Sequence, residues 1–232
     1  SSSGLGFGHG TLKRDTEELC NLMNYLVHNH NAETFALVGH STGCQNSVHF
    51  AKYGERDLIE RIKVMALQAP VSDREDAMTG PNYAKNIEHA KKLQDMGKEE
   101  EMMPRDAFWA PITAARFLSL QDVGGDDDFF SSDFEDQELC LRLRHIGQRG
   151  DQVGLRALVA FSGADEYVPE SVDKSLLLER LCAAMNNGCS SPSEQAAIPL
   201  MLETGNHNLS NEEGDKETFV NAVKDLLKEA AS

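Results

Sequence analysis

A serine at position 41 lies between two glycines, in the sequence Gly39-His40-Ser41-Thr42-Gly43. A serine hydroxyl is a weak nucleophile unless a base lies beside it, and a sharp turn from a strand into a helix exposes it to such a base. The apolar run Thr34–Gly39 precedes this serine, and a helical pattern begins at about Gly43. The backbone of such a turn is crowded, so small residues are expected two positions to either side. The motif therefore predicts a reactive serine at a strand-to-helix turn.

The same reasoning predicts where the partners of Ser41 lie. An acid and then a histidine are expected after later strands. The apolar run Leu155–Ser162 is followed by Asp165, and the run Ala197–Thr204 is followed by His207. Open α/β sheets place their sites just beyond the carboxyl ends of the strands. We therefore predict that Ser41, Asp165 and His207 form a catalytic triad.

Other residues compete for these roles. Glu166 follows Asp165 directly and is the alternative acid. Further histidines have structural interpretations, at the end of a predicted helix, within the motif and on the helix after it: His28, His30, His40 and His49. The run Asp126-Asp127-Asp128 lacks the spacing of a calcium-binding loop, so we expect surface acidity and no metal site there. Cys44 is interpreted as a small buried packing residue.

The surrounding pattern is that of an α/β protein. Four near-continuous apolar runs read as strands of a parallel sheet with helices on both faces: Thr34–Gly39, Ile62–Ala69, Leu155–Ser162 and Ala197–Thr204. Helical patterns are expected over about Thr11–His28, from about Gly43, from about Ser171 and near the C-terminus. We interpret residues 1–232 as one domain, with 71–154 as an inserted helical and acidic lid. The alternative is that this insertion is a solvated, partly mobile segment that does not act as a lid.

Composition excludes several classes of function. Lysine and arginine number 22 and aspartate and glutamate 38, so the net charge is −16. Such a chain is repelled by phosphate backbones, which argues against nucleic-acid binding. No apolar run of 18 or more residues predicts a membrane span, and Ser1–Gly10 does not read as a signal peptide. Five widely spaced cysteines without a C-x-x-C pair favour free thiols in a reducing compartment, so we expect a cytoplasmic protein.

At this point the residues resemble a known superfamily. Ser41, Asp165 and His207 in this order resemble the α/β-hydrolases, and longer stretches resemble a fungal and plant hydrolase family that includes the fungal siderophore esterases. Those stretches are Gly39–Gln45, Gln68–Glu75, Gly124–Asp128 and Ser162–Pro169. The resemblance implies an α/β-hydrolase fold, the triad predicted above and hydrolysis of esters. It implies that the N–H of Thr42 binds the oxyanion and that no metal or organic cofactor is needed.

The chain departs from this family's pattern at its N-terminus. The superfamily has four strands before the nucleophile strand, whereas only 33 residues precede Thr34 here. We therefore expect the N-terminal strands to be missing, with the glycine-rich loop that supplies the second oxyanion donor. Losing one such donor typically costs about 10²–10³ in rate. The edge of the nucleophile strand is expected to be uncovered, and a complete form is expected to be more stable and more active.

The sequence thus predicts a serine esterase that attacks a small ester through an acyl-enzyme. The family resemblance extends the substrate to siderophore-like esters, and an acidic lid suits a cationic or neutral substrate better than an anionic one. Two alternatives stay open: a hydrolase-fold binding protein with impaired catalysis, and an amidase or peptidase with the same triad. The oligomeric state is not encoded in any pattern that we recognise.

Overall fold

We describe a computed structural model of the chain, covering residues 6–191, 195–211 and 213–231. The first five residues of Ser1–Gly10 lie outside the described residues. Among the described residues, no helix combines the length and apolar character needed to cross a bilayer.

The described residues contain one sheet of four parallel strands in the order β1-β2-β3-β4. The strands are β1 (Phe35–His40), β2 (Ile62–Gln68), β3 (Arg156–Ser162) and β4 (Ala197–Leu202). Each lies within two residues of its predicted run. Helices cover both faces because the central strands are apolar on both: Met65 and Leu67 of β2 pack into one core, and Val64 and Ala66 pack into another.

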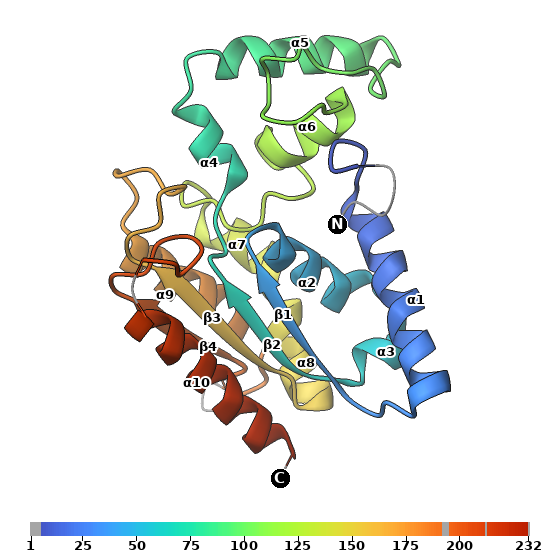
Figure 1. The fold of residues 1–232 in the computed structure, drawn as a ribbon, viewed down its shortest axis with the longest axis vertical. Helices are drawn as coiled ribbons and strands as arrows, with labels where there is room; N and C mark the ends of the chain where they lie inside the picture. The colour runs from blue at the N-terminus through green and yellow to red at the C-terminus, as the bar shows by residue number, and fades with distance from the viewer. Residues whose placement is uncertain (1–5, 192–194, 212, 232) are drawn as a thin grey trace.

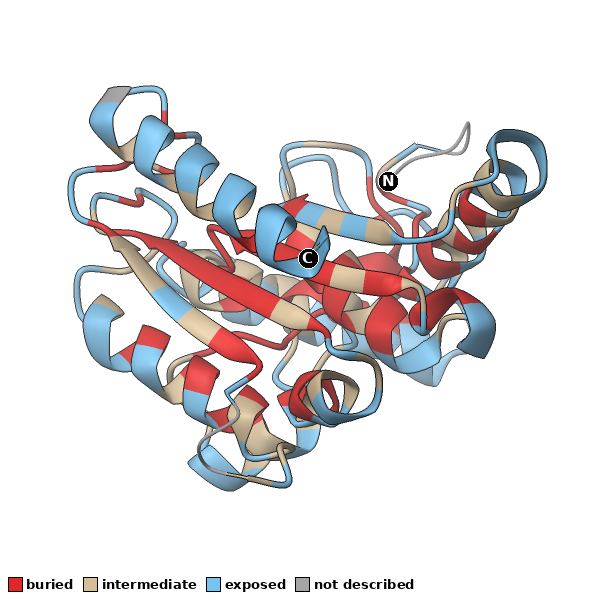
Figure 2. Ribbon diagram, turned by 90° about the horizontal axis from the view of Figure 1, so that it is seen from below, coloured by how far each residue is buried: buried red, intermediate tan, exposed pale blue. Residues whose placement is uncertain are grey.

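One face of the sheet carries most of the helices (Figure 1). They are α1 (Leu12–His30), α2 (Thr42–Tyr53), α3 (Arg56–Ile59), α7 (Asp136–Leu143), α8 (His145–Val153) and α9 (Lys174–Asn186). The opposite face is covered by α10 (Glu213–Ala231), which packs against β2, β3 and β4. Figure 2 shows buried residues along the strands and exposed residues on the outer surface of α10.

A separate layer lies beyond the carboxyl ends of β1 and β2 (Figure 1). It contains α4 (Asp73–Met78), α5 (Tyr83–Asp95) and α6 (Ala114–Gln121). Helices α5 and α6 have a small hydrophobic core of their own, centred on Leu93, Ile112 and Phe117. We call α4–α6 the cap. That the cap acts as a lid over a site stays a prediction.

The cap is shorter than the predicted 71–154 insertion. Leu139 and Leu143 of α7 and Ile146 of α8 are fully buried in the main core with the sheet and α9. These two helices therefore belong to the layer that covers the sheet. The apolar spacing of residues 136–153 indicates a helix but does not reveal which surface that helix packs against.

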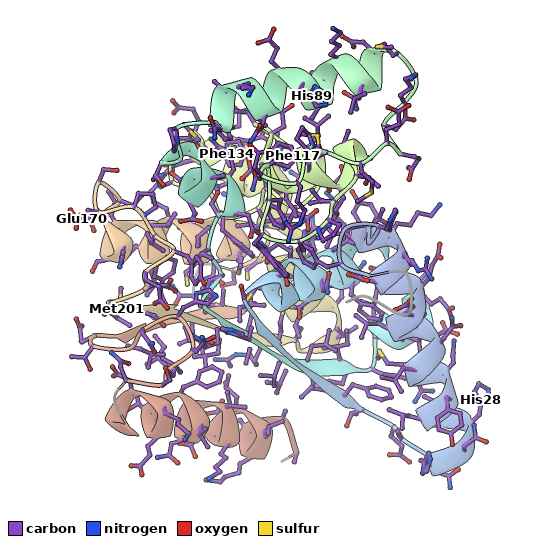
Figure 3. The ribbon with its side chains drawn as sticks, turned by 45° about the horizontal axis from the view of Figure 1, so that its top comes forward. His28, His89, Phe117, Phe134, Glu170 and Met201 are labelled. Carbon is purple, nitrogen blue, oxygen red and sulfur yellow. The ribbon has the colours of Figure 1, made fainter. Side chains whose placement is uncertain are left out.

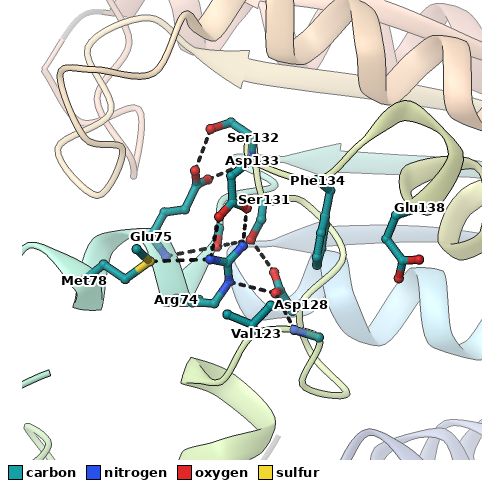
Figure 4. A network of polar contacts seen from close by, with 12 residues as sticks. Arg74, Glu75, Met78, Val123, Asp128, Ser131, Ser132, Asp133, Phe134 and Glu138 are labelled. Carbon is teal, nitrogen blue, oxygen red and sulfur yellow. Dashed lines mark hydrogen bonds and ion pairs between the residues drawn. The ribbon is translucent and has the colours of Figure 1, made fainter. Parts of the chain in front are cut away.

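A buried ionic network joins α4 to the loop that leaves the cap (Figure 4). Arg74 donates from Nε to Asp128 at 2.8 Å and from both terminal nitrogens to Asp133. Glu75 accepts from the main chain and the hydroxyl of Ser132 at 2.9 and 2.5 Å. These contacts join the start of the cap to the loop that follows the cap, and so fix α4 over the carboxyl ends of the strands.

The acidic run of this loop is not simply surface acidity, as the sequence led us to expect. Asp127 and Asp128 are both buried. Asp127 accepts from Arg116 and from Ser119, each at 2.6 Å, while Asp128 pairs with Arg74. Both carboxylates are retained inside the protein because each has an arginine partner. Among the described residues, no group of three or more potential metal ligands is arranged to hold an ion.

Candidate active site

Ser41 occupies a strained turn between β1 and α2. Its backbone angles are φ 53° and ψ −125°, a positive φ that is uncommon for a residue with a side chain. Gly39 makes the turn possible, because a Cβ there would lie 2.4 Å from the carbonyl oxygen of Gly43. Gly43 itself has open space around the position of a Cβ. The prediction that both flanking positions must be small therefore holds for Gly39 and is wrong for Gly43.

Thr42 is the first residue of α2. The N–H groups of a first helical turn have no carbonyl partner within the helix, and the helix dipole favours negative charge at that end. Its main-chain N–H is thus chemically suited to bind an anion beside Ser41.

Asp165 and His207 are hydrogen-bonded to each other. The Nδ1 of His207 lies 2.9 Å from Asp165 Oδ2 and 3.1 Å from Oδ1, and both residues are buried. A carboxylate only accepts, so Nδ1 carries the proton and Nε2 keeps its lone pair. Asp165 also accepts from the main-chain N–H of Tyr167, and Lys174 donates to the carbonyls of Gly163 and Asp165.

Glu166, the alternative acid, takes another position. It accepts a hydrogen bond from the main-chain N–H of His207 at 2.9 Å. It therefore holds the backbone of the histidine loop, whereas Asp165 bonds the imidazole ring.

Ser41 and His207 line the same cavity, of about 330 Å³, beneath the cap. Two carboxylates of α4, Asp73 and Asp76, also line it. The remaining wall is largely aromatic and comes from the N-terminal segment, the cap and the loop after β3: Phe7, Phe108, Trp109 and Tyr167. Trp109 is 72% exposed, which is unusual for the single tryptophan of a chain.

The protein environment perturbs both α4 carboxylates. Asp73 keeps some exposure to the cavity, yet desolvation, reinforced by the nearby charge of Asp127, raises its pKa from 3.8 to about 7 against an opposing effect of Arg116. Burial, and then the charge of Asp165, raises the pKa of Asp76. Carboxyl groups whose pKa is shifted upward in a cavity are frequent at functional sites. Neither Asp73 nor Asp76 is among the site residues that the sequence predicts.

The other candidate residues have structural roles. His28 donates from Nδ1 to the carbonyl of Asn24 near the end of α1, away from the carboxyl ends of the strands (Figure 3). His49 contacts Thr16 at 2.7 Å. Cys44 is fully buried and donates to the carbonyls of Gly39 and Gln68, and burial raises the pKa of its thiol well above the usual range. The interpretation of Cys44 as a packing residue is confirmed.

A parallel sheet with helices on both faces, a serine on a strained turn and an Asp–His pair beyond later strands define an α/β-hydrolase fold. The chain belongs to the family described as "Protein of unknown function (DUF1749)", whose family model matches residues 1–228. The predicted resemblance to α/β-hydrolases and to the family of fungal siderophore esterases is confirmed by the comparisons that follow.

Among solved structures, a siderophore hydrolase, EstB from Aspergillus fumigatus, superposes with a TM-score of 0.73 at 26% identity, covering 98% of this chain and 78% of that one. An α/β-hydrolase-fold protein of unknown function superposes with a TM-score of 0.57 at 19% identity, covering 98% of this chain and 74% of that one, and supports the fold alone.

Curated relatives are also fungal. A UPF0613 protein of Schizosaccharomyces pombe, PB24D3.06c, is 32% identical over 85% of this chain and 66% of its own length. The fusarinine C esterase sidJ of Aspergillus fumigatus is 29% identical over 92% of this chain and 73% of its own length. The esterase AN6793 of Emericella nidulans is 32% identical over 78% of this chain and 63% of its own length. The chain thus spans roughly two thirds of the length of these relatives.

Proposed function

We propose that this chain is a serine hydrolase that cleaves carboxylic esters through Ser41, His207 and Asp165. The observation that carries the proposal is the Asp165–His207 hydrogen bond, made at Nδ1, on an imidazole that lines one cavity with the strained Ser41. This tautomer leaves Nε2 facing away from Asp165 and able to accept a proton. The printed names of sidJ, AN6793 and EstB support the reaction class.

In this mechanism, Nε2 of His207 takes the proton of the Ser41 hydroxyl as the oxygen attacks the ester carbonyl. Asp165 keeps the imidazole in the required tautomer and stabilises the imidazolium that forms. The main-chain N–H of Thr42 donates to the oxyanion at the start of α2. His207 then returns the proton to the leaving alcohol, and water releases the acid from the acyl-enzyme in the reverse sequence.

We infer that the substrate is a small ester that is neutral or positively charged where it enters the cavity. Where they are ionised, the two α4 carboxyl groups repel an anionic group, and aromatic rings with carboxylates favour an ammonium group. The described residues that line the cavity include no lysine or arginine. The names of the fungal relatives extend this inference to siderophore-type esters.

The decisive experiment uses a fluorophosphonate, which labels activated serines, together with p-nitrophenyl esters. We expect the wild-type chain to be labelled at Ser41, and Ser41→Ala to lose both labelling and turnover. Ser47 is a suitable control, because it lies on the same helix and its hydroxyl donates to the carbonyl of Gly43. Labelling that persists in Ser41→Ala, or wild type that is not labelled at all, contradicts the proposal and favours a binding protein on this fold.

The substrate inference is tested separately, with ethyl esters that differ only in the charge of the acyl chain. We expect kcat/KM to fall in the order cationic, neutral, anionic. An anionic ester that is hydrolysed as fast as the cationic one contradicts it. Amide analogues in the same panel distinguish an amidase from an esterase.

We also propose that the protein is cytoplasmic. All five cysteines are free in the structure, as expected in a reducing compartment. Fractionation of cells that express a tagged protein tests this, and recovery from a secretory compartment contradicts it.

A further inference from the structure

Gln68 is the last residue of β2, a strand that contributes no member of the proposed triad. Strand β2 lies between β1, which leads into Ser41, and β3, which leads to Asp165. Gln68 is only 5% exposed although its side chain is polar. A buried amide needs hydrogen-bond partners, so the identity of those partners shows what this residue does.

The Gln68 side chain bonds to segments that carry two of the triad residues. Its Nε2 donates to the main-chain carbonyl of His207 at 3.1 Å and to the hydroxyl of Ser162 at 3.3 Å, three residues before Asp165. The main-chain carbonyl of Gln68 accepts from the N–H of Ser41 at 3.1 Å. One residue therefore contacts all three segments that the triad comes from.

His40 completes this arrangement. Its Nδ1 lies 2.5 Å from Gln68 Oε1, and its Nε2 lies 3.1 Å from Asn208 Oδ1. The carbonyl of His207 can only accept, so the amide nitrogen of Gln68 must face it and Oε1 must face His40. His40 Nδ1 is therefore the donor. The ring of His40 also lies against the ring of His207, with centroids 4.9 Å apart.

We propose that Gln68, oriented by His40, is a positioning residue that holds the His207 loop in register with Ser41 and Asp165. Every polar atom of its side chain is used, and the bonds run to separate strands or loops. Small displacements of reacting groups have large effects on rate, since a shift of about 1 Å can cost about 10²-fold. The inference rests on the proposed function, because it concerns the geometry of the same triad.

The test compares Gln68→Met, which keeps the side-chain length and removes all three hydrogen bonds, with Gln121→Met. Gln121 is also a buried glutamine, but it lies on α6 in the cap. We expect Gln68→Met to lower kcat and the rate of Ser41 labelling in parallel by 10- to 100-fold, with KM within threefold of wild type. Gln121→Met is expected to leave both rates within threefold.

A second pair covers the case in which Gln68→Met does not fold. His40 is exposed, so substitutions there are compatible with folding. His40→Gln keeps a donor for Gln68 Oε1, whereas His40→Phe keeps a ring against His207 and removes the donor. We expect His40→Gln to retain more of kcat and of the labelling rate than His40→Phe.

The outcomes separate the two proposals. If wild type is labelled and Gln68→Met is labelled at the same rate, only the positioning role fails. If Gln68→Met melts at a lower temperature but keeps kcat below that temperature, the glutamine is merely structural and the inference is wrong. When Gln68→Met is unfolded, equal rates in the two His40 variants overturn it. If wild type is not labelled, the proposed function fails, and this inference with it.

Discussion

Arg74 and Asp128 form an ion pair whose side chains are 1% and 0% exposed, with Nε and Oδ2 2.8 Å apart. Removing one partner of a buried pair leaves an unpaired charge in the interior, which typically costs about 3–5 kcal/mol. We expect Arg74→Met to lower the free energy of unfolding by about that amount in urea titrations. The exposed pair Arg56–Glu60 is the control, and Arg56→Met there is expected to cost less than about 1 kcal/mol.

The same substitution has a functional consequence. Helix α4 carries Asp73 and Asp76 into the cavity, and Arg74 lies between them in sequence. Loosening this helix is expected to raise KM for a cationic ester more than it lowers kcat. Equal stability of Arg74→Met and Arg56→Met contradicts the assigned role of the network.

The two glycines of the motif should respond differently to alanine. A Cβ at Gly39 meets backbone atoms at 2.4 to 2.8 Å, so Gly39→Ala must displace the turn that presents Ser41. Gly43 is the second residue of α2 and has open space for a Cβ, so alanine fits there and is expected to add about 0.4–1 kcal/mol by restricting the unfolded chain. We expect Gly39→Ala to lower both the melting temperature and Ser41 labelling, and Gly43→Ala to raise the melting temperature slightly.

Asp165 and Glu166 make different contacts with His207, and substitutions should distinguish their roles. Asp165→Asn replaces the carboxylate by a neutral amide that can donate as well as accept, so it no longer fixes the imidazole tautomer or stabilises the imidazolium, and such a change can cost about 10⁴ in kcat. Glu166→Gln keeps an oxygen that can accept from the main-chain N–H of His207, so we expect a loss of less than about tenfold. Steady-state kinetics on one p-nitrophenyl ester measures both. A larger loss of kcat in Glu166→Gln than in Asp165→Asn would show that Glu166, and not Asp165, is the acid of the triad.

The raised pKa of Asp73 predicts that the stability of the fold depends on pH. Its pKa is raised from 3.8 to about 7 in the folded protein, so the folded state keeps a proton that the unfolded state releases. Stability therefore falls as pH rises between these values and stays reduced above pH 7. Asp73→Asn removes this loss. We expect its melting temperature to exceed that of wild type by more at pH 8 than at pH 5.

Asp106→Asn, at an exposed aspartate, is the matched control for that experiment. The melting temperature of Asp106→Asn is expected to differ from that of wild type by the same small amount at pH 5 and at pH 8. If the difference in melting temperature between Asp73→Asn and wild type is also independent of pH, the carboxyl of Asp73 is ionised at both pH values, which contradicts the raised pKa.

The fold is largely predictable from the sequence because each strand is a short apolar run that is followed by polar residues. The places of Ser41, Asp165 and His207 after such runs predict them as the site residues, and their catalytic roles stay a proposal. The cap boundary was not predictable, since the periodicity of α7 and α8 does not say which surface covers them. Gln68 could not be predicted from the sequence either, because only the fold brings His40, Ser162 and His207 into contact with it.

Strand β1 pairs only with β2 within the described part of the chain, and its Val38 is 59% exposed. Its free side offers backbone N–H and C=O groups to solvent. Amide protons there are expected to exchange with water sooner than those of β2 and β3, which are flanked on both sides. Ser41 thus follows one edge strand of the described sheet, β1, and His207 follows the other, β4, whereas Asp165 follows β3, which has a neighbour on each side. A segment that pairs with the free side of β1 is expected to slow hydrogen exchange along the strand that leads into Ser41.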